Sequence, residues 1–380
     1  MKRYKVITYG CQMNVHESEK LEGMLSAAGY SRTDISGEAD LIIFNTCCIR
    51  AGAENKTFSN IGALKKLKDK KPDLKIAVCG CMPQKKDALE KLKTRFPYVD
   101  IIFGTHNLHK LTDYLTAAEN NCCRVIDVWD HEDGVAESQP YLRSGGKTAW
   151  VNIMYGCDNF CAYCIVPYVR GRERSRNAED IINEIKELAK TSAYEEICLL
   201  GQNVNSYRGM HGGETINFAE LLRLLCEIEG DFKITFMTSH PKDLSDEVIE
   251  LIGKNQKLKK TIHLPVQSGS DNILKAMNRK YTAGYYEGLI EKIRAAAPNA
   301  ELTSDIIVGF PGETEEDYNK TLDLIRRVKF NNLFMFMFSA REGTPAYNLP
   351  NQLPLEIKRG RLIKLIALQR KIQKEIQKET

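Results

Sequence analysis

The sequence predicts an α/β protein in which an N-terminal domain, built on a parallel sheet, is followed by a partial (βα)6 barrel. Short apolar runs alternate with helical patterns twice along the 380-residue chain. A polar, acidic stretch at residues 120–147 separates the two alternations. We therefore expect an N-terminal α/β domain at 1–119, a linker at 120–147 and a second domain at 148–380.

The first alternation has the order of parallel βαβ units. The predicted strands lie at 4–9, 40–45, 75–78 and 99–103, and the predicted helices lie at 17–28, 53–67 and 84–96. The carboxyl ends of parallel strands meet at one edge of a sheet, where α/β proteins bind ligands. Residues that follow these strands are therefore candidates for a functional site.

The second alternation contains six strand patterns, two fewer than a closed barrel has. The predicted strands lie at 150–154, 196–200, 233–237, 261–264, 302–308 and 333–338, and the main helices at 178–190, 218–228, 285–297 and 315–328. The chain then continues into an amphipathic helix at 355–378 with a Lys-rich outer face. Its apolar side chains, three and four residues apart, are Leu365, Leu368, Ile372 and Ile376.

Composition narrows the class of protein. The hydrophobic share is 43%, and no apolar run approaches the roughly 18–20 residues that a membrane span needs. The first residues do not resemble a signal peptide, so we expect a cytoplasmic protein without a membrane partner. In that reducing compartment, twelve cysteines indicate metal ligation or catalysis more than disulfides. The net charge of +4 permits nucleic-acid binding without requiring it.

Three closely spaced cysteines follow the first barrel strand. Cys157, Cys161 and Cys164 can hold three corners of a 4Fe–4S cluster and leave the fourth iron open for chemistry. The loop lies at the carboxyl end of a strand, where barrel enzymes place their active sites. The alternatives are a zinc knuckle without its fourth ligand or three unrelated cysteines. We favour the cluster because no nearby His or Cys completes a zinc site.

Cysteines also follow three strands of the N-terminal domain. Cys11, Cys47 and Cys81 lie just past predicted strand ends, so parallel topology brings their thiols to one edge of the sheet. This placement predicts a second iron–sulfur cluster that is held by three cysteines and has one open iron. The position alone leaves Cys48, beside Cys47, as an alternative. Cys79 is interpreted as the last residue of a buried strand, where cysteine behaves as a small hydrophobe.

Several motifs give the chain a family resemblance. The sequence around the barrel cysteines resembles the radical S-adenosylmethionine (SAM) superfamily and, within it, the MiaB-type methylthiotransferases. The resemblance covers essentially the whole chain. The motifs that carry it lie at 155–167, 170–176, 200–207, 238–241, 263–270 and 305–314. Proteins of this family normally continue into a β-barrel RNA-binding domain called TRAM, and we expect residues 1–380 to lack this domain.

The resemblance implies two 4Fe–4S clusters, one of them on Cys11, Cys47 and Cys81, with SAM on the open iron of the barrel cluster. It implies reductive SAM cleavage and transfer of a methylthio group to C2 of N(6)-isopentenyladenosine at position 37 of tRNA. The partners are then tRNA and a low-potential electron donor; the sulfur donor is not identified. One alternative is a sister methylthiotransferase acting on threonylcarbamoyladenosine in tRNA or on a ribosomal-protein aspartate. Another is a non-catalytic iron–sulfur or zinc RNA-binding protein.

Further site residues are expected at strand ends and in a basic run. The expected SAM contacts, each with an alternative role in packing or a turn, are Gly201, Gln202, Gln267, Asp305 and Gly309. Five arginines are expected to contact RNA phosphates or to neutralise the SAM carboxylate, the alternative being a solvated face. They are Arg170, Arg172, Arg174, Arg176 and Arg341. No role is assigned to Cys122, Cys123, Cys198 or Cys226.

Overall fold

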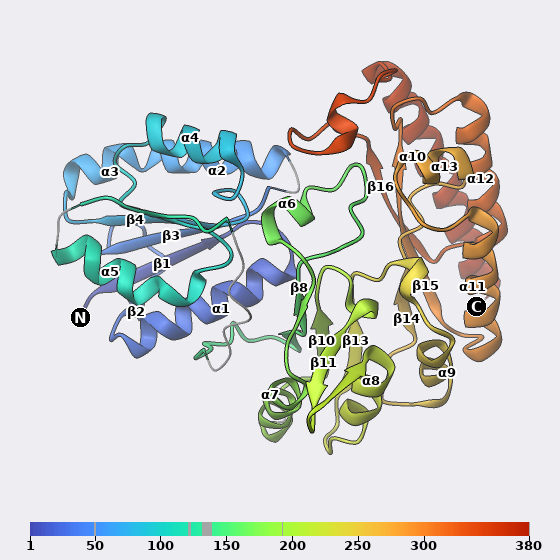
Figure 1. The fold of residues 1–380 in the computed structure, drawn as a ribbon, viewed down its shortest axis with the longest axis horizontal. Coiled ribbons are helices and arrows are strands. Elements are labelled where there is room, and N and C mark those ends of the chain that lie inside the picture. The colour runs from blue at the N-terminus through green and yellow to red at the C-terminus, as the bar shows by residue number, and fades with distance from the viewer. Residues whose placement is uncertain (49–50, 121–122, 131–138, 192, 380) are drawn as a thin grey trace. The chain divides into compact units, whose positions relative to one another are not determined.

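The chain forms two compact units in a computed structural model (Figure 1). The first unit comprises residues 1–156 and 165–174, and the second comprises 157–164 and 175–380. The structure describes residues 1–48, 51–120, 123–130, 139–191 and 193–379. Cys122 and the central part of the predicted linker lie outside the described residues.

The first unit is built on a six-stranded parallel sheet of order β2-β1-β3-β4-β5-β6. Its strands are β1 (Arg3–Thr8), β2 (Ser31–Arg32), β3 (Leu41–Thr46), β4 (Lys75–Gly80), β5 (Ile101–Phe103) and β6 (Val125–Asp127). The four predicted strands are β1, β3, β4 and β5. The short edge strands β2 and β6 were not predicted, because two or three residues carry no readable periodicity.

Helices cover both faces of this sheet (Figure 1). One face is covered by α1 (Gln12–Ala27) and α5 (Leu111–Asn120), and the other by α2 (Ala51–Ala63), α3 (Lys65–Lys70) and α4 (Lys86–Arg95). Leu21 and Leu115 belong to the core on the first face, and Ile61 and Leu92 to the core on the second. The central strands β3, β4 and β5 are largely apolar on both sides because both faces are buried.

Parts of the segment predicted as a linker are ordered within the first unit. Strand β6 extends the sheet, and farther along the backbone N–H of Leu142 donates to the carbonyl of Glu19 in α1 at 2.9 Å. A Cβ on Gly23 of α1 would lie 2.2 Å from the carbonyl oxygen of Pro140, so only glycine allows this close approach. The unit also contains β7 (Thr148–Asn152), β8 (Met154–Tyr155) and α6 (Val166–Arg170), and β9 (Arg174–Ser175) reaches its boundary.

The second unit contains the parallel strands of the partial barrel. Strand β10 pairs with β13, and β14 pairs with β15, which pairs with β16. Their bounds are β10 (Glu196–Leu200), β13 (Lys233–Phe236), β14 (Thr261–His263), β15 (Glu301–Val308) and β16 (Asn332–Met337). They correspond to five predicted strands, and β7 corresponds to the sixth. The predicted fold class is confirmed.

Helices and one hairpin complete the second unit. The helices are α7 (Ala178–Lys190), α8 (Phe218–Cys226), α9 (Asp246–Lys254), α10 (Asp271–Ala276), α11 (Ala283–Ala296), α12 (Glu315–Val328) and α13 (Leu355–Glu379). Helices α9 and α10 were not predicted, nor was the antiparallel hairpin of β11 (Arg208–His211) and β12 (Glu214–Asn217). Short 3-10 helices are η1 (Leu108–Lys110), η2 (Val204–Ser206), η3 (Pro241–Asp243) and η4 (Pro345–Asn348).

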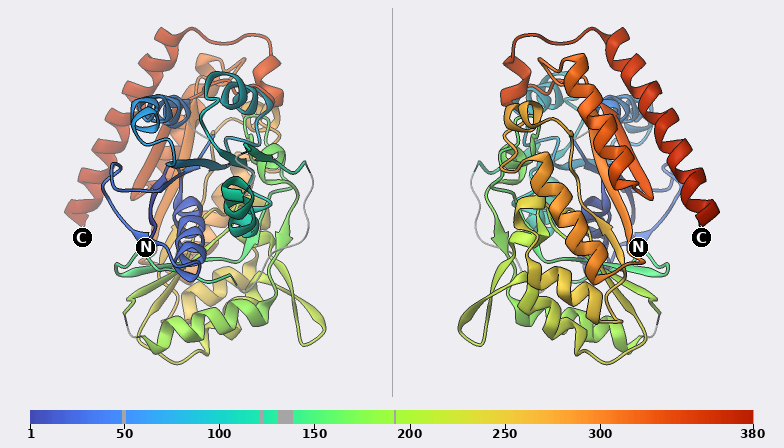
Figure 2. Two further views of the ribbon diagram at one scale, coloured as in Figure 1. Left: turned by 90° about the vertical axis from the view of Figure 1, so that its left-hand side faces the viewer. Right: turned by 90° about the vertical axis from the view of Figure 1, so that its right-hand side faces the viewer.

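Helix α13 forms as predicted and lies beside α12 across one face of β15 and β16 (Figure 2). Leu365 and Ile372 are buried, and Arg361 and Gln369 continue the same stripe. The Arg361 guanidinium pairs with Glu313, and the Gln369 side chain donates to the carbonyl of Phe330 at 2.8 Å. Among the described residues, no helix is both long enough and apolar enough to cross a membrane.

Candidate functional site

The first unit places three of the predicted cysteines at one edge of its sheet. Cys11 directly precedes α1, Cys47 follows β3, and Cys81 follows β4. Strands β1, β3 and β4 are neighbours and parallel, so their carboxyl ends lie side by side. The topology therefore brings the three loops together, as the sequence predicted.

Glycines and a buried amide hold these loops close. Gly10 has a φ of +130°, and a Cβ there would lie 2.7 Å from the Cβ of Cys47. Gly80 has a φ of +91°, and the next residue, Cys81, donates its N–H to the carbonyl of Thr46 at 2.9 Å. Asn14, which is fully buried, donates to the same carbonyl at 3.2 Å. These contacts within the protein hold the three cysteine loops close to one another.

A buried ion pair contacts Cys81 within the first unit. Arg170 donates from Nε to the Sγ of Cys81 at 3.2 Å. Its two terminal nitrogens donate to the Glu17 carboxylate at 2.6 Å and 3.2 Å. The side chains of Arg170 and Glu17 are 4% and 2% exposed, so the pair lies in a medium that screens charge weakly.

Cys48 and Cys79 have different surroundings. Cys79 is fully buried in the core beneath α1 and α5, which supports its interpretation as a small hydrophobe. Cys48 packs with Cys81, Ile165 and Val169. A hydrogen bond from the Cys48 thiol outweighs burial and lowers the pKa of Cys81 to about 7, while the charges of Arg170 and Glu17 act on it in opposite directions. The same hydrogen bond and burial raise the pKa of Cys48, so Cys81 is the better thiolate.

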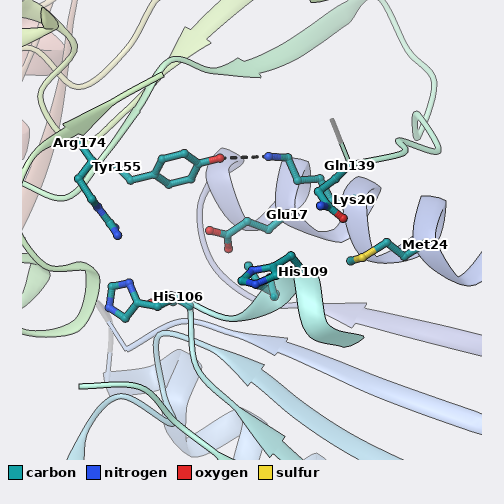
Figure 3. Close-up of a pocket in the computed structure, with 10 residues that line it drawn as sticks. Glu17, Lys20, Met24, His106, His109, Gln139, Tyr155 and Arg174 are labelled. Carbon is teal, nitrogen blue, oxygen red and sulfur yellow. Dashed lines mark hydrogen bonds between the residues drawn. The ribbon is translucent and has the colours of Figure 1, made fainter. Parts of the chain in front are cut away.

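A pocket lined by both charged and apolar side chains lies beside Glu17 in the same unit (Figure 3). Glu17, Lys20 and Met24 project from successive turns of α1, and His106 and His109 face them from the segment after β5. Lys20 donates from Nζ to the hydroxyl of Tyr155 at 3.1 Å. The remaining lining residues are Thr105, Leu108, Gln139 and Arg174. The pocket thus borders the carboxylate that holds Arg170.

The second unit contains the other cysteine loop, which carries Cys157, Cys161 and Cys164. Backbone hydrogen bonds clamp its middle from both sides: Ala162 donates to Met277 at 2.9 Å and accepts from Ala346 at 2.8 Å. The Asn278 side chain donates to the carbonyl of Phe160 at 2.8 Å, and Phe160 has a φ of +44°. The loop is therefore held in a tight, specific shape rather than lying free on the surface.

A second buried arginine contacts this loop. Arg279 donates to the Sγ of Cys161 at 3.3 Å and to the hydroxyl of Tyr163 at 3.4 Å. Its other nitrogens donate to the hydroxyl of Tyr281 and to the carbonyl of Pro265, each at 2.8 Å. The contact with Cys161 places a guanidinium within hydrogen-bond distance of a cysteine sulfur that is predicted to ligate iron.

One face of β15 and β16 remains open. On β15 the side chains of Asp305 and Ile307 are half-buried, whereas Ile306 between them is buried. On β16, Phe334 and Phe336 are 47% and 37% exposed, and the Phe334 ring lies edge-on to His263. This open face offers aromatic and acidic side chains to a ligand.

The predicted SAM contacts are only partly gathered by the structure. Gln267 adopts a φ of +71° and bonds through its backbone to Asp305 and Ile307 of β15. Gly309 follows β15, but its N–H already donates to Glu313 at 2.6 Å. Gly201 and its neighbour Gln202 follow β10, which pairs with β13 and not with β14, β15 or β16.

Comparison with known proteins identifies the family. Residues 3–104 match the model of "Uncharacterized protein family UPF0004", and residues 151–325 match the "Radical SAM superfamily". The tRNA-2-methylthio-N(6)-dimethylallyladenosine synthase of Clostridium tetani is 54% identical over 95% of this chain and 79% of that protein. The enzyme of the same name from Caldicellulosiruptor saccharolyticus is 55% identical over 97% of this chain and 78% of that protein. The chain belongs to the tRNA-2-methylthio-N(6)-dimethylallyladenosine synthase family.

Solved structures support the fold of this chain. The radical SAM methyltransferase TsrM from Kitasatospora setae has a TM-score of 0.65 at 12% identity, covering 91% of this chain and 75% of that protein. The radical SAM enzyme OxsB has a TM-score of 0.59 at 13% identity, covering 97% of this chain and 56% of that protein. Identities this low bear on the fold alone. Synthases of this family use SAM and 4Fe–4S clusters.

Two of the five arginines predicted to contact RNA are buried in ion pairs. Arg170 is buried against Glu17 and Cys81, and Arg176 is buried and paired with Glu184 at 2.7 Å, so neither is free to reach a phosphate. Arg172 is exposed, and Arg174 and Arg341 are half-buried. Only these three arginines keep the predicted role.

In the part of the chain that the structure describes, no group of three or more His, Cys, Asp or Glu side chains is arranged to hold a single metal ion. A 4Fe–4S cluster holds its thiolates at separate iron corners and does not need such convergence. The sequence pattern missed Glu17 and Arg279, which carry no motif; only the three-dimensional packing brings them to the cysteines. Cys48 was recognised only as an alternative to Cys47.

Proposed function

We propose that the chain is a radical SAM methylthiotransferase that adds a methylthio group to C2 of N(6)-isopentenyladenosine at position 37 of tRNA. The observation that carries this proposal is the 51–55% identity, over nearly the whole chain, to synthases named for that product. The UPF0004 and radical SAM matches fall on the two segments that contain the two cysteine sets.

In this proposal Cys157, Cys161 and Cys164 hold the cluster that binds SAM, and the first-unit cysteines Cys11, Cys47 and Cys81 hold the other. The clamped loop and the Arg279 contact to Cys161 fit the first assignment, and the pinned loops with a thiolate-prone Cys81 fit the second. When bound, SAM and the clusters supply the one-electron chemistry and the transferable sulfur.

The residues of the chain bind, orient and shield the reactants. Within the described residues, the Oε1 of Gln267 is buried without a hydrogen-bond partner, which suits it to accept from a polar group of SAM. Asp305 lies on the adjoining strand and is the second candidate. Gly201, Gln202 and Gly309 are retained as weaker SAM candidates because they line strand ends.

The open face of β16 suits the proposed base. Phe334 and Phe336 present aromatic rings on which a flat adenine or an apolar isopentenyl tail can pack. Burial is worth about 0.8 kcal/mol for each methylene-sized group, so a five-carbon tail supplies a few kcal/mol of discrimination. Arg172, Arg174 and Arg341 are proposed to contact phosphates, which would make binding sensitive to salt.

The proposed partners follow from this chemistry. They are tRNA and a low-potential one-electron donor, and a tRNA substrate implies a cytoplasmic site of action. No residue of the chain identifies the donor of replacement sulfur.

Mass spectrometry of tRNA nucleosides tests the proposal. A strain lacking this chain should accumulate N(6)-isopentenyladenosine and lack its 2-methylthio form, and the intact gene should restore it. A gene encoding Cys157→Ala should fail to restore it. Loss of a methylthio group from threonylcarbamoyladenosine instead would assign the chain to the sister class of enzyme, and unchanged tRNA would contradict a role in tRNA modification.

A further inference from the structure

Each cysteine set contacts one buried arginine. Within the first unit Arg170 donates to the sulfur of Cys81 at 3.2 Å, and within the second Arg279 donates to the sulfur of Cys161 at 3.3 Å. Hydrogen bonds to the sulfurs and nearby charge are among the features that set the reduction potential of an iron–sulfur cluster. The charged groups around each arginine therefore bear on the reduction potential of the cluster beside it.

The charge of Arg170 is compensated. Both oxygens of the Glu17 carboxylate accept from its terminal nitrogens, in the fork geometry that suits a guanidinium. Since both side chains are almost fully buried, the pair acts as a neutral unit beside Cys81. It offers a hydrogen bond to the sulfur but little net charge.

The charge of Arg279 is not compensated in this way. Its remaining contacts are the hydroxyls of Tyr163 and Tyr281 and the carbonyl of Pro265, all of them neutral groups. No carboxylate in the described part of the chain forms an ion pair with it. Burial of the guanidinium weakens solvent screening, so its positive charge acts strongly on Cys161.

We propose that this difference sets the order in which the two clusters accept an electron. Arg279 makes the cluster on Cys157, Cys161 and Cys164 the easier to reduce, because a nearby cation stabilises the added negative charge. Glu17 cancels the charge of Arg170 and keeps the cluster on the first-unit cysteines harder to reduce. Arg279 and Glu17 thus direct the electron to the cluster that binds SAM, and the cluster that carries sulfur stays oxidised. This inference rests on the proposed cluster ligands.

Potentiometric titration of single-cluster proteins, followed by electron paramagnetic resonance, tests the inference. One parent has Ala at 157, 161 and 164 and keeps the first-unit cluster; the other has Ala at 11, 47 and 81 and keeps the second-unit cluster. Glu17→Gln in the first parent should raise the midpoint potential, and Arg279→Gln in the second should lower it. The matched controls are Glu38→Gln in the first parent and Arg326→Gln in the second, both at exposed residues in surface ion pairs. Neither should change the midpoint potential of its parent.

Charge-conserving variants separate electrostatics from packing. Glu17→Asp and Arg279→Lys keep each charge and should stay near the potential of their parent. Shifts as large as those of the neutral variants would assign the effect to packing and overturn the inference. The two unmodified parents give a test that needs neither variant: the second-unit cluster must have the higher potential, and the reverse order overturns the inference.

The iron content distinguishes failure of the inference from failure of the proposed ligands. Each parent should retain about four irons per chain and the absorbance of a 4Fe–4S cluster. A parent without a cluster contradicts the ligand assignment. A parent that keeps its cluster while the neutral variants leave its potential unchanged contradicts only the role of Glu17 and Arg279.

Discussion

Single positions decide whether the first cysteine set can assemble. Gly10→Ala would place a methyl group 2.4 Å from the side-chain oxygen of Asn14 and 2.7 Å from the Cβ of Cys47, at a φ of +130°. We expect a loss of about 1–3 kcal/mol in the free energy of unfolding, because the conformation is costly for a residue with a Cβ. The first-unit cluster should also lose iron.

Urea unfolding and iron analysis check this prediction. Gly37→Ala is the control, because a Cβ at Gly37 meets nothing within 4 Å and its φ is not positive. Equal stability and iron content in the two variants would show that the loops can separate without cost.

Glu19 should make stability depend on acid pH. Burial opposes its ionisation, but hydrogen bonds from His16 and Ser144 and the charge of Arg143 outweigh burial and lower its pKa from 4.5 to about 2. Above about pH 4.5 the ionised carboxylate stabilises the native state in full. As the pH falls towards 2, the unfolded chain takes up the proton first, and up to about 3 kcal/mol is lost.

Unfolding free energies measured between pH 5 and about pH 2.5 check the Glu19 prediction. In Glu19→Gln this contribution is absent at every pH, so its stability should fall less steeply over the same range. Parallel curves for the two proteins would mean that Glu19 has an ordinary pKa in the native state.

Helix α13 is held to the second unit by a narrow stripe. Leu365→Ala should cost about 2–5 kcal/mol, because the leucine is fully buried and its truncation leaves a cavity. Ile363→Ala is the control within the same helix, since Ile363 is 67% exposed and should change stability little. Urea denaturation of both variants gives the comparison, and equal losses would contradict the observed docking face.

The sequence predicted elements that repeat a clear pattern and missed those that do not. Strands β3 and β15 carry long apolar or alternating patterns, so they were recognised. Strands β2 and β6 are too short for any pattern, and the β11–β12 hairpin is built largely from polar residues and glycines. The last part of the supposed linker is polar, yet it is ordered by contacts with Glu19 that no local pattern reveals.

The same limit applies to the site. The gathering of Cys11, Cys47 and Cys81 could be predicted, because parallel strands bring their carboxyl ends to one edge. The role of Arg170 could not, because its partner Glu17 lies 153 positions away in the sequence. A run of arginines looks like a phosphate-binding surface until the structure shows which members are buried and paired.

The chain taken as one enzyme should carry two independent clusters. Anaerobically reconstituted protein is expected to hold about eight irons, as two four-iron clusters. Replacing Cys157, Cys161 and Cys164 with Ala should leave about half, because the other set lies in a separate compact unit. Iron and sulfide analysis measures this. A triple variant that loses all its iron, or none, would contradict two separate sites.

The most direct measurement of the proposed activity uses the purified, reconstituted protein with reductant, SAM and three tRNAs that differ only at position 37. These tRNAs carry unmodified adenosine, N(6)-isopentenyladenosine or threonylcarbamoyladenosine, and mass spectrometry of the digested nucleosides reports the product. We predict a 2-methylthio product from the isopentenylated tRNA, formed far faster than from the other two and more slowly as salt rises. Equal conversion of modified and unmodified adenosine, or preference for the threonylcarbamoyl group, would contradict the proposed substrate.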